Sequence, residues 1–362
     1  MSTQNRRGAV HFNQEGYQEL QELLKQGSFS SVFVLTDTNT QQHCLTPFLQ
    51  KFNSDLPLEV IEMEAGEEHK TLETCEGIWK ALSELGADRK SLLINLGGGV
   101  VTDLGGFVAC GFRRGIEFIH FPTTLLAMVD AAIGGKNGVN LGSLKNQVGV
   151  ITPPAMVVAD TEFLKTLPAP EMRSGLAEML KHGLIASPGY WEKLKALKDL
   201  TLADLDELVL ESVRIKQEVV LKDPREEGLR KTLNFGHTLG HAIESFCLEE
   251  EKREKLLHGE AVAIGMVLEA FLSAQATGFP QEQLEEVRDS IKELYGVIPF
   301  NASEIEKIKT LLKFDKKNEA GKINFVLLAR IGKPVIDREV PDRLIEEAFQ
   351  YYLEGQRNSL KI

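Results

Sequence analysis

The sequence is poor in cysteine and tryptophan. Its 362 residues include four cysteines and two tryptophans, and Cys44, Cys75, Cys110 and Cys247 form no Cys-x-x-Cys pair. This spacing excludes a disulfide framework and a cysteine zinc cluster, and it indicates reduced cysteines in a core.

The chain also lacks an excess of positive charge and a long apolar run. Acidic residues outnumber basic ones by 53 to 41, so the formal net charge is −12. No chain-wide positive field attracts nucleic acid or an anionic membrane, and we expect neither as a partner. No apolar run approaches the length that spans a bilayer, and the first residues lack the core of a signal peptide. We therefore expect a cytoplasmic protein that meets anionic ligands with local basic clusters.

Short β-branched runs alternate with helical patterns over the first 160 residues. Strands are expected over 32–35, 58–61, 92–96, 116–119 and 157–160, with a helix over 72–85. Such alternation is typical of a parallel sheet covered by helices. We predict a Rossmann-like α/β nucleotide-binding domain over residues 1–160.

Glycines and polar residues follow the ends of these strands, where ligands of parallel sheets bind. The turn Gly97-Gly-Gly99 lets backbone amides approach a pyrophosphate at a helix start. Alone it is a weak signal, because glycines also make tight turns. The Pro-Thr-Thr124 turn one strand later strengthens it, and the glycine-rich segment 130–146 carries two lysines of the kind that meet phosphate.

Helical periodicity dominates after residue 160. Helices are expected over 171–185, 203–222, 281–295, 302–312 and 342–353, and a hairpin is expected to pair 323–328 with 335–336. We predict a mostly α-helical, metal-binding domain over residues 161–362.

The stretch 230–241 gathers Arg230, Asn234, His237 and His241 at spacings of four, three and four. This spacing predicts four side chains along one face of one helix. Histidines at i and i+4 can bind one zinc ion with a third ligand from elsewhere, while a buried structural pair is the alternative. The other polar residues of the row, and His258 soon after, favour a site.

Together these motifs resemble the 3-dehydroquinate synthase family, of the sugar-phosphate cyclase superfamily, over nearly the whole chain. The segments that carry the resemblance are Gly-Gly-Gly-Val-Val-Thr-Asp103, Pro-Thr-Thr-Leu-Leu126, Val-Asp-Ala-Ala-Ile-Gly-Gly-Lys136, Leu-Lys-Asn146, Gly-Leu-Ala-Glu-Met-Leu-Lys181, the stretch 230–241 and His-Gly-Glu260. Thr102, where the family usually has glycine, and Cys110-Gly-Phe112 depart from the pattern without removing a charge.

The resemblance implies a homodimeric enzyme of the shikimate pathway that uses NAD and a divalent metal, zinc or cobalt. It converts 3-deoxy-D-arabino-heptulosonate 7-phosphate into 3-dehydroquinate and phosphate. The steps are transient oxidation by NAD, phosphate elimination, reduction, ring opening and intramolecular aldol closure. The implied metal ligands are Glu178, His237 and His258, with His241 near the substrate instead.

The resemblance also implies the other site residues. NAD contacts are Asp37, Asn39, Glu67, Lys70, Gly98, Gly99, Asp103, Thr123, Thr124, Lys145 and Thr166. Catalytic and substrate-binding residues are Asp130, Lys136, Asn146, Lys181, Glu226, Arg230, Asn234, His241, Lys316 (or its neighbour Lys317) and Arg114, which acts in the partner subunit's site.

Three alternatives stay open: another sugar-phosphate cyclase, a metal-dependent polyol dehydrogenase that releases NADH, and a non-catalytic protein stabilised by metal and nucleotide. Asn234, His241 and Lys316 favour the synthase over other cyclases. The charges of Lys136, Lys181 and Arg230 disfavour the non-catalytic protein, because buried charges are costly without a ligand.

Overall fold

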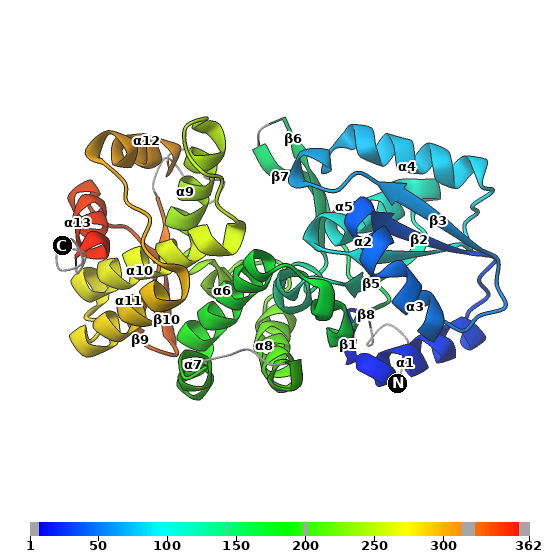
Figure 1. Ribbon diagram of the computed structural model, residues 1–362, viewed down its shortest axis with the longest axis horizontal. Coiled ribbons are helices and arrows are strands. Elements are labelled where there is room, and N and C mark those ends of the chain that lie inside the picture. The colour runs from blue at the N-terminus through cyan, green and yellow to red at the C-terminus, as the bar shows by residue number, and fades with distance from the viewer. Residues whose placement is uncertain (1–6, 143, 198–201, 313–322, 355–362) are drawn as a thin grey trace. The chain divides into compact units, whose positions relative to one another are not determined.

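The computed structural model describes residues 7–142, 144–197, 202–312 and 323–354 (Figure 1). The chain divides into two compact units. The first comprises Met1–Met172 with Leu200–Gln217, and the second comprises Arg173–Asp199 with Glu218–Ile362.

Within the described residues, the first unit contains a parallel sheet of six strands in the order β1-β8-β5-β4-β2-β3. The strands are β1 (Ala9–Phe12), β2 (Val32–Asp37), β3 (Leu58–Met63), β4 (Leu92–Gly97), β5 (Glu117–Pro122) and β8 (Met156–Ala159). The five strands expected from the sequence are present. The sequence did not predict β1, whose four partly exposed residues are too few for a recognisable pattern.

Different helices cover the two faces of this sheet (Figure 1). Helices α4 (Leu72–Glu84) and α5 (Gly99–Gly111) pack on the face that carries Phe118. Helices α1 (Asn13–Gln26) and α3 (Leu45–Lys51) cover the other face, where the rings of Tyr17 and Phe48 lie 5.5 and 5.0 Å from that of Phe121. Phe118 and Phe121 point to opposite faces because side chains alternate along a strand.

Short elements complete the first unit. They are α2 (Thr38–His43), the 3₁₀ turns η2 (Glu67–His69), η3 (Phe112–Arg114) and η5 (Thr161–Thr166), the π-turn η4 (Ala127–Ala131), and the antiparallel hairpin of β6 (Lys136–Leu141) and β7 (Leu144–Ile151). The glycine-rich segment 130–146 of the sequence therefore includes most of this hairpin.

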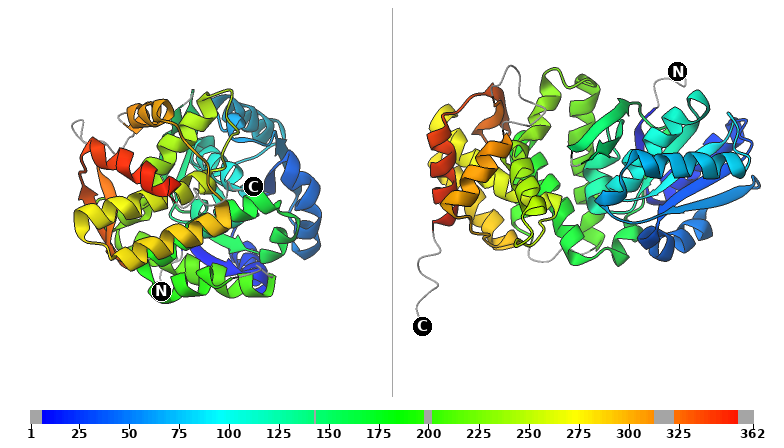
Figure 2. Two further views of the ribbon diagram at one scale, coloured as in Figure 1. Left: turned by 60° about the vertical axis from the view of Figure 1, so that its left-hand side comes forward. Right: turned by 90° about the horizontal axis from the view of Figure 1, so that it is seen from above.

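Helices build the second unit around α10 (His258–Thr277). The other elements are α6 (Ala169–Ala186), which begins in the first unit, α7 (Pro188–Lys195), the end of α8 (Leu202–Lys222), η6 (Leu229–Asn234), α9 (His237–Glu249), α11 (Gln281–Tyr295), α12 (Ala302–Leu312), β9 (Phe325–Arg330), β10 (Lys333–Arg338) and α13 (Asp342–Leu353). Helices α9, α11 and α13 and strand β9 all contact α10 (Figures 1 and 2).

Most residues of the central helix α10 are apolar. By length and composition it could cross a membrane, but 72% of its most apolar window is buried inside the structure. A mostly apolar and mostly buried helix is typical of a protein core.

The prediction that residues 230 to 241 form one helix is wrong. Arg230 and Asn234 belong to the 3₁₀ helix η6, and α9 begins at His237. Gly236 between them has φ of +78°, a left-handed conformation that glycine adopts readily and that ends a helix. The four polar side chains therefore lie on two segments and not on one helical face.

Candidate active site

The carboxyl ends of β2, β4 and β5 form one edge of the first unit's sheet, because these strands are parallel neighbours. Asp37 ends β2 and caps α2, Thr123 follows β5, and the N–H of Thr123 donates to the carbonyl of Gly97 at 3.0 Å. Of the other predicted NAD contacts, Asn39 lies in α2 and Thr166 ends η5.

The glycine turn at this edge leaves little room for side chains. A Cβ on Gly98 would lie 3.0 Å from Cγ2 of Thr124, and one on Gly99 would lie 3.3 Å from Cβ of Ala131. Helix α5 begins at Gly99 without a side-chain cap at Gly98. Its first N–H groups and its dipole therefore suit an anionic group.

Lys70 is the centre of a buried network beside this turn. Its Nζ donates to Oδ2 of Asp103 at 2.7 Å and to Oδ1 of Asn146 at 2.6 Å. Burial lowers the pKa of Lys70, but the carboxylates of Asp103 and Glu67 outweigh burial and raise it, so the ammonium is charged. Asn140 completes the network by donating to Oε1 of Glu67 at 2.9 Å and accepting from the N–H of Asn146 at 2.8 Å. The network thus joins predicted NAD contacts to the β6–β7 hairpin.

The remaining predicted residues of the first unit lie on separate short elements. Arg114 ends η3, Lys136 begins β6, and Lys145 lies in β7 beside Asn146. Asp130 lies in η4, where its Oδ1 accepts from Nζ of Lys216 at 2.5 Å. Lys216, from α8, was not singled out in the sequence because a lysine in a charged amphipathic helix gives no local signal.

In the second unit, three predicted metal ligands converge. Oε1 of Glu178, in α6, lies 3.3 Å from Nε2 of His237 and 3.5 Å from Nε2 of His258. Glu178 is fully buried, and within the described parts of the chain no donor makes a hydrogen bond of good geometry to this oxygen. A buried oxygen facing two imidazole nitrogens is an arrangement that a cation can satisfy.

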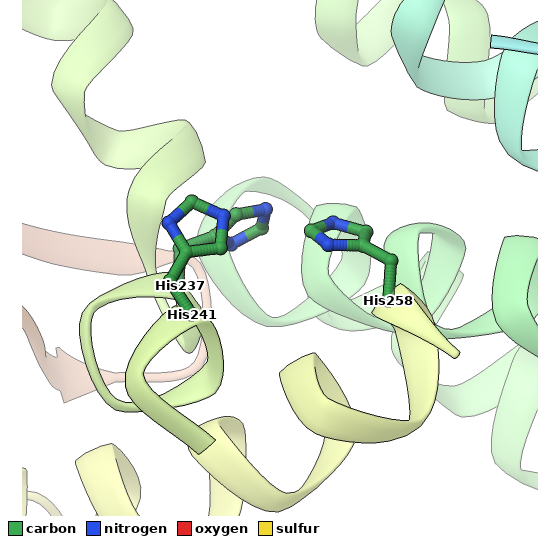
Figure 3. A group of neighbouring side chains, drawn as sticks. All are labelled: His237, His241 and His258. Carbon is green, nitrogen blue, oxygen red and sulfur yellow. The ribbon is translucent and has the colours of Figure 1, made fainter. Parts of the chain in front are cut away.

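Each of these two imidazoles is held by its other nitrogen. Nδ1 of His237 lies 3.1 Å from the carbonyl oxygen of Phe235, and Nδ1 of His258 lies 3.3 Å from Oε2 of Glu244. His241 belongs to the same cluster, with its ring centroid 5.2 Å from that of His237 and 5.6 Å from that of His258. Figure 3 shows His237 and His241 on one helix, facing His258 at the start of another. The three rings can also form a ligand set by themselves.

The buried charges of this cluster shift one another. Burial raises the pKa of Glu178, but Lys181 and His237 outweigh it and hold the pKa well below its usual range. Burial, with a contribution from Lys181, lowers the pKa of His237 to about 4. Burial also lowers the pKa of His258, but Glu178 and Glu244 raise it to about 10.

The other predicted residues of the second unit lie close to this cluster in the chain. Lys181 donates to Oε2 of Glu178 one turn away in α6. Arg230 is buried and donates to the carbonyl of Pro224 at 2.9 Å, and Asn234 donates to Oε1 of Glu226 at 2.8 Å. Lys316 and Lys317 lie outside the described residues.

Three predicted site residues share an unusual backbone. Arg114, Asn146 and Glu226 have φ of +69°, +51° and +63°. Non-glycine residues rarely adopt this left-handed region, and such strain concentrates at functional sites.

Comparison with known proteins identifies the family. The family model described as 3-dehydroquinate synthase N-terminal matches residues 60–174. The family model described as 3-dehydroquinate synthase C-terminal matches residues 175–318. The chain belongs to the 3-dehydroquinate synthase family. It is 44% identical to the 3-dehydroquinate synthase of Parabacteroides distasonis over 93% of this chain and 95% of the relative. It is 42% identical to that of Leptospira interrogans over 91% and 90%.

Solved structures of sugar-phosphate cyclases share the fold, which confirms the predicted fold class. A 2-deoxy-scyllo-inosose synthase complexed with carbaglucose-6-phosphate, NAD⁺ and Co²⁺ is 25% identical with a TM-score of 0.82, over 94% of this chain and 96% of that one. A 2-epi-5-epi-valiolone synthase from Streptomyces hygroscopicus with NAD⁺ and Zn²⁺ is 26% identical with a TM-score of 0.78, over 95% and 96%.

Membership of the 3-dehydroquinate synthase family confirms that the chain is an enzyme and decides among the alternatives left open by the sequence. An iron-containing alcohol dehydrogenase from Thermococcus thioreducens, at 15% identity and a TM-score of 0.66 over 96% and 99%, shares the fold alone. The dehydrogenase alternative therefore rests on architecture, whereas the synthase is supported by the sequence of both halves of the chain.

Proposed function

We propose that this chain converts 3-deoxy-D-arabino-heptulosonate 7-phosphate into 3-dehydroquinate and phosphate, with NAD and one divalent metal ion as cofactors. The observation that carries the proposal is the convergence of His237 and His258 on one buried oxygen of Glu178, in a member of the 3-dehydroquinate synthase family. When bound, NAD supplies reversible hydride transfer and the metal supplies a Lewis acid.

The proposed metal ligands are Glu178, His237 and His258. Zinc bonds of about 2.0–2.1 Å in a tetrahedral sphere place neighbouring ligand atoms about 3.4 Å apart. The two N···O distances of 3.3 and 3.5 Å fit this spacing. A protein oxygen at each Nδ1 is the usual second contact of a metal-binding imidazole. His241 then belongs to the substrate and not to the metal.

The proposed NAD contacts lie along the sheet edge of the first unit. The first N–H groups of α5, at the glycine turn, suit the pyrophosphate. Asp37, Asn39, Glu67, Thr123, Thr124, Lys145 and Thr166 follow from the family. Lys70 and Asp103 hold each other in place by their ion pair at this edge.

The proposed substrate residues supply charges that suit a phosphorylated sugar acid. Lys136, Asn146, Arg230 and His241 suit the phosphate, and Lys181 and Arg114 suit other oxygen-rich parts. The N–H of Arg230 donates to Oδ2 of Asp223 at 2.9 Å, and its guanidinium donates to the carbonyl of Pro224. The first bond fixes the backbone of Arg230, and the second fixes its guanidinium. Asp130, Glu226, Asn234 and Lys316 complete the set.

The test follows the stoichiometry of NAD. With the C7 phosphate substrate in excess and NAD below substrate concentration, phosphate should be released in large excess over NAD. Absorbance of NADH should stay near the enzyme concentration, because the hydride that is removed is returned. NADH that accumulates in step with substrate loss, without phosphate, contradicts the synthase and favours a dehydrogenase.

We also propose a homodimer in which Arg114 serves the partner subunit's site. An inactive Arg114→Ala subunit mixed with an inactive Lys181→Ala subunit should then regain part of the activity, because each heterodimer has one intact site. Native mass spectrometry verifies that subunits exchange. No recovery after verified exchange places Arg114 in the site of its own subunit.

Three further predictions from the sequence remain proposals. The protein is cytoplasmic, it binds neither nucleic acid nor membrane, and its functions divide between an NAD-binding domain over residues 1–160 and a metal- and substrate-binding domain over residues 161–362. The net charge of −12 supports the absence of a nucleic-acid partner.

A further inference from the structure

Glu269 is a buried carboxylate that the proposed reaction does not use. It lies in α10 and is fully buried. Its Oε2 accepts from the N–H of Gly236 at 2.6 Å, and its Oε1 accepts from the N–H of Leu239 at 3.1 Å. An ionised carboxylate only accepts hydrogen bonds, so two backbone donors match its two oxygens.

These two bonds cap α9 from a different helix. A helix start is usually capped by a side chain of its own N-cap residue, and Gly236 in that position has none. Glu269 takes this role, since its two oxygens accept from the N–H groups of Gly236 and Leu239 at the start of α9. His237 is the first residue of α9 and lies between the two N–H groups that Glu269 holds.

Helices α9 and α10 also approach each other closely beside these bonds. A Cβ added to Gly265 of α10 would lie 2.0 Å from the carbonyl oxygen of Gly236, and one added to Gly240 would lie 3.1 Å from that of Ala261. Backbone meets backbone, with no flexible side chain between them. A shift of α10 at Gly265 is therefore passed to the backbone of Gly236, which directly precedes His237.

A second carboxylate acts in the opposite direction. Glu244 of α9, which is also buried, holds Nδ1 of His258, the first residue of α10. Each of the two helices thus begins with a histidine and carries, further along, a glutamate that holds the beginning of the other. We call Glu244 and Glu269 the crossed carboxylates.

We propose that the crossed carboxylates are positioning residues that set the distance and orientation of the imidazoles of His237 and His258 for one divalent metal ion. This inference rests on the proposed metal ligands. Removing such outer contacts typically weakens metal binding by about 10- to 100-fold.

The test is cobalt binding, because Co²⁺ has a visible spectrum that reports its ligand geometry. We expect Glu269→Gln to weaken Co²⁺ binding about 10- to 100-fold in competition with a chelator, and to change the spectrum at saturating Co²⁺. The amide keeps the side-chain volume but presents N–H to one of the two donors. Glu244→Gln should produce a change of the same kind, and it provides the test if Glu269→Gln does not fold.

The matched control is Glu304→Gln in α12. Glu304 bonds Arg253 and the N–H of Asn301 in the same unit, so it makes the same change of charge away from the histidines. It should bind Co²⁺ with wild-type affinity and spectrum.

Wild-type affinity and spectrum in both Glu269→Gln and Glu244→Gln overturn the inference, even if Glu269→Gln lowers the stability of the metal-free protein. The failure of the ligand assignment is distinguishable from this outcome. If His237→Ala binds Co²⁺ like the wild type, the proposed ligands are wrong and the positioning role falls with them.

Discussion

The two units hold their functional groups by different means. In the first unit, the proposed NAD contacts come from the ends of neighbouring parallel strands, and the central group is backbone N–H at a glycine turn. In the second unit, the groups are side chains of three helices that contact one another directly; Glu178 and His237 are buried and His258 is partly buried. The topology of the sheet creates the first arrangement, whereas individual side-chain contacts create the second. Single substitutions should therefore abolish the metal site and only weaken the nucleotide site.

The largest effect is expected from His237→Ala. It should remove stoichiometric metal and reduce activity to background, because a ligand with a fixed partner at Nδ1 is lost. Metal analysis of the purified protein and phosphate release measure the two effects. His241→Ala should keep its metal although the ring is equally close to the cluster. If His241→Ala also loses its metal, His241 is a ligand and the three-histidine set is the better description.

A smaller effect is expected from Asp103→Ala in the first unit. The Lys70–Asp103 pair is buried, with 4% and 18% of the side chains exposed. Removing one partner of a buried pair costs about 3–5 kcal/mol, because the buried ammonium of Lys70 loses the carboxylate that it bonds. Urea unfolding without NAD measures the loss. The double variant Lys70→Met/Asp103→Ala should recover much of the lost free energy of unfolding, because no charge then remains at the site. A loss below about 1 kcal/mol in Asp103→Ala alone would show that water screens the pair.

The smallest effect concerns pH and compares buried histidines of the two units. In contrast to His258, His120 in β5 has its pKa lowered to about 3 by burial, while Nδ1 accepts from Asn95 at 3.2 Å. A folded-state pKa below the unfolded value of about 6.5 means that the unfolded chain binds more protons, so stability falls as pH falls. Between pH 7 and pH 5, the free energy of unfolding falls by about 2 kcal/mol because of His120.

Urea unfolding at both pH values should therefore show a smaller loss for His120→Gln than for the wild type, by about 2 kcal/mol. His43→Gln, at the exposed end of α2, is the control and should behave as the wild type. Equal losses in His120→Gln and the wild type show that the imidazole is not held neutral by the fold.

Most of the fold follows from the sequence because its signals are local. The helices at 281–295, 302–312 and 342–353 have the bounds that periodicity gives, and the hairpin near 323–336 is present as β9 and β10. The proposed NAD contacts at the sheet edge are equally predictable from the sequence, since glycines and threonines at strand ends lie together in any parallel sheet.

The site in the second unit is harder to predict from the sequence, because its contacts join residues that are distant in the chain. The spacing of His237 and His241 predicted a ligand pair, but Glu178 entered through family resemblance alone. The row beginning at Arg230 failed as a single helix because Gly236 adopts a left-handed conformation, which a glycine permits but does not require. Glu244 and Glu269 were missed because a glutamate in a helix resembles a solvated one until its partners are known.

The left-handed backbone of Arg114, Asn146 and Glu226 has a consequence for engineering. At the exposed Arg114, glycine would relieve the local strain and should raise the melting temperature, while removing a side chain that the proposed reaction needs. Glycine at Asn146 or Glu226 would also remove the acceptor of a bond from Lys70 or from Asn234, so the strain relieved there is offset by lost contacts. A selection for thermal stability alone would therefore favour an inactive enzyme at Arg114, and the gain from Arg114→Gly measures how much stability this enzyme gives up for its chemistry at that position.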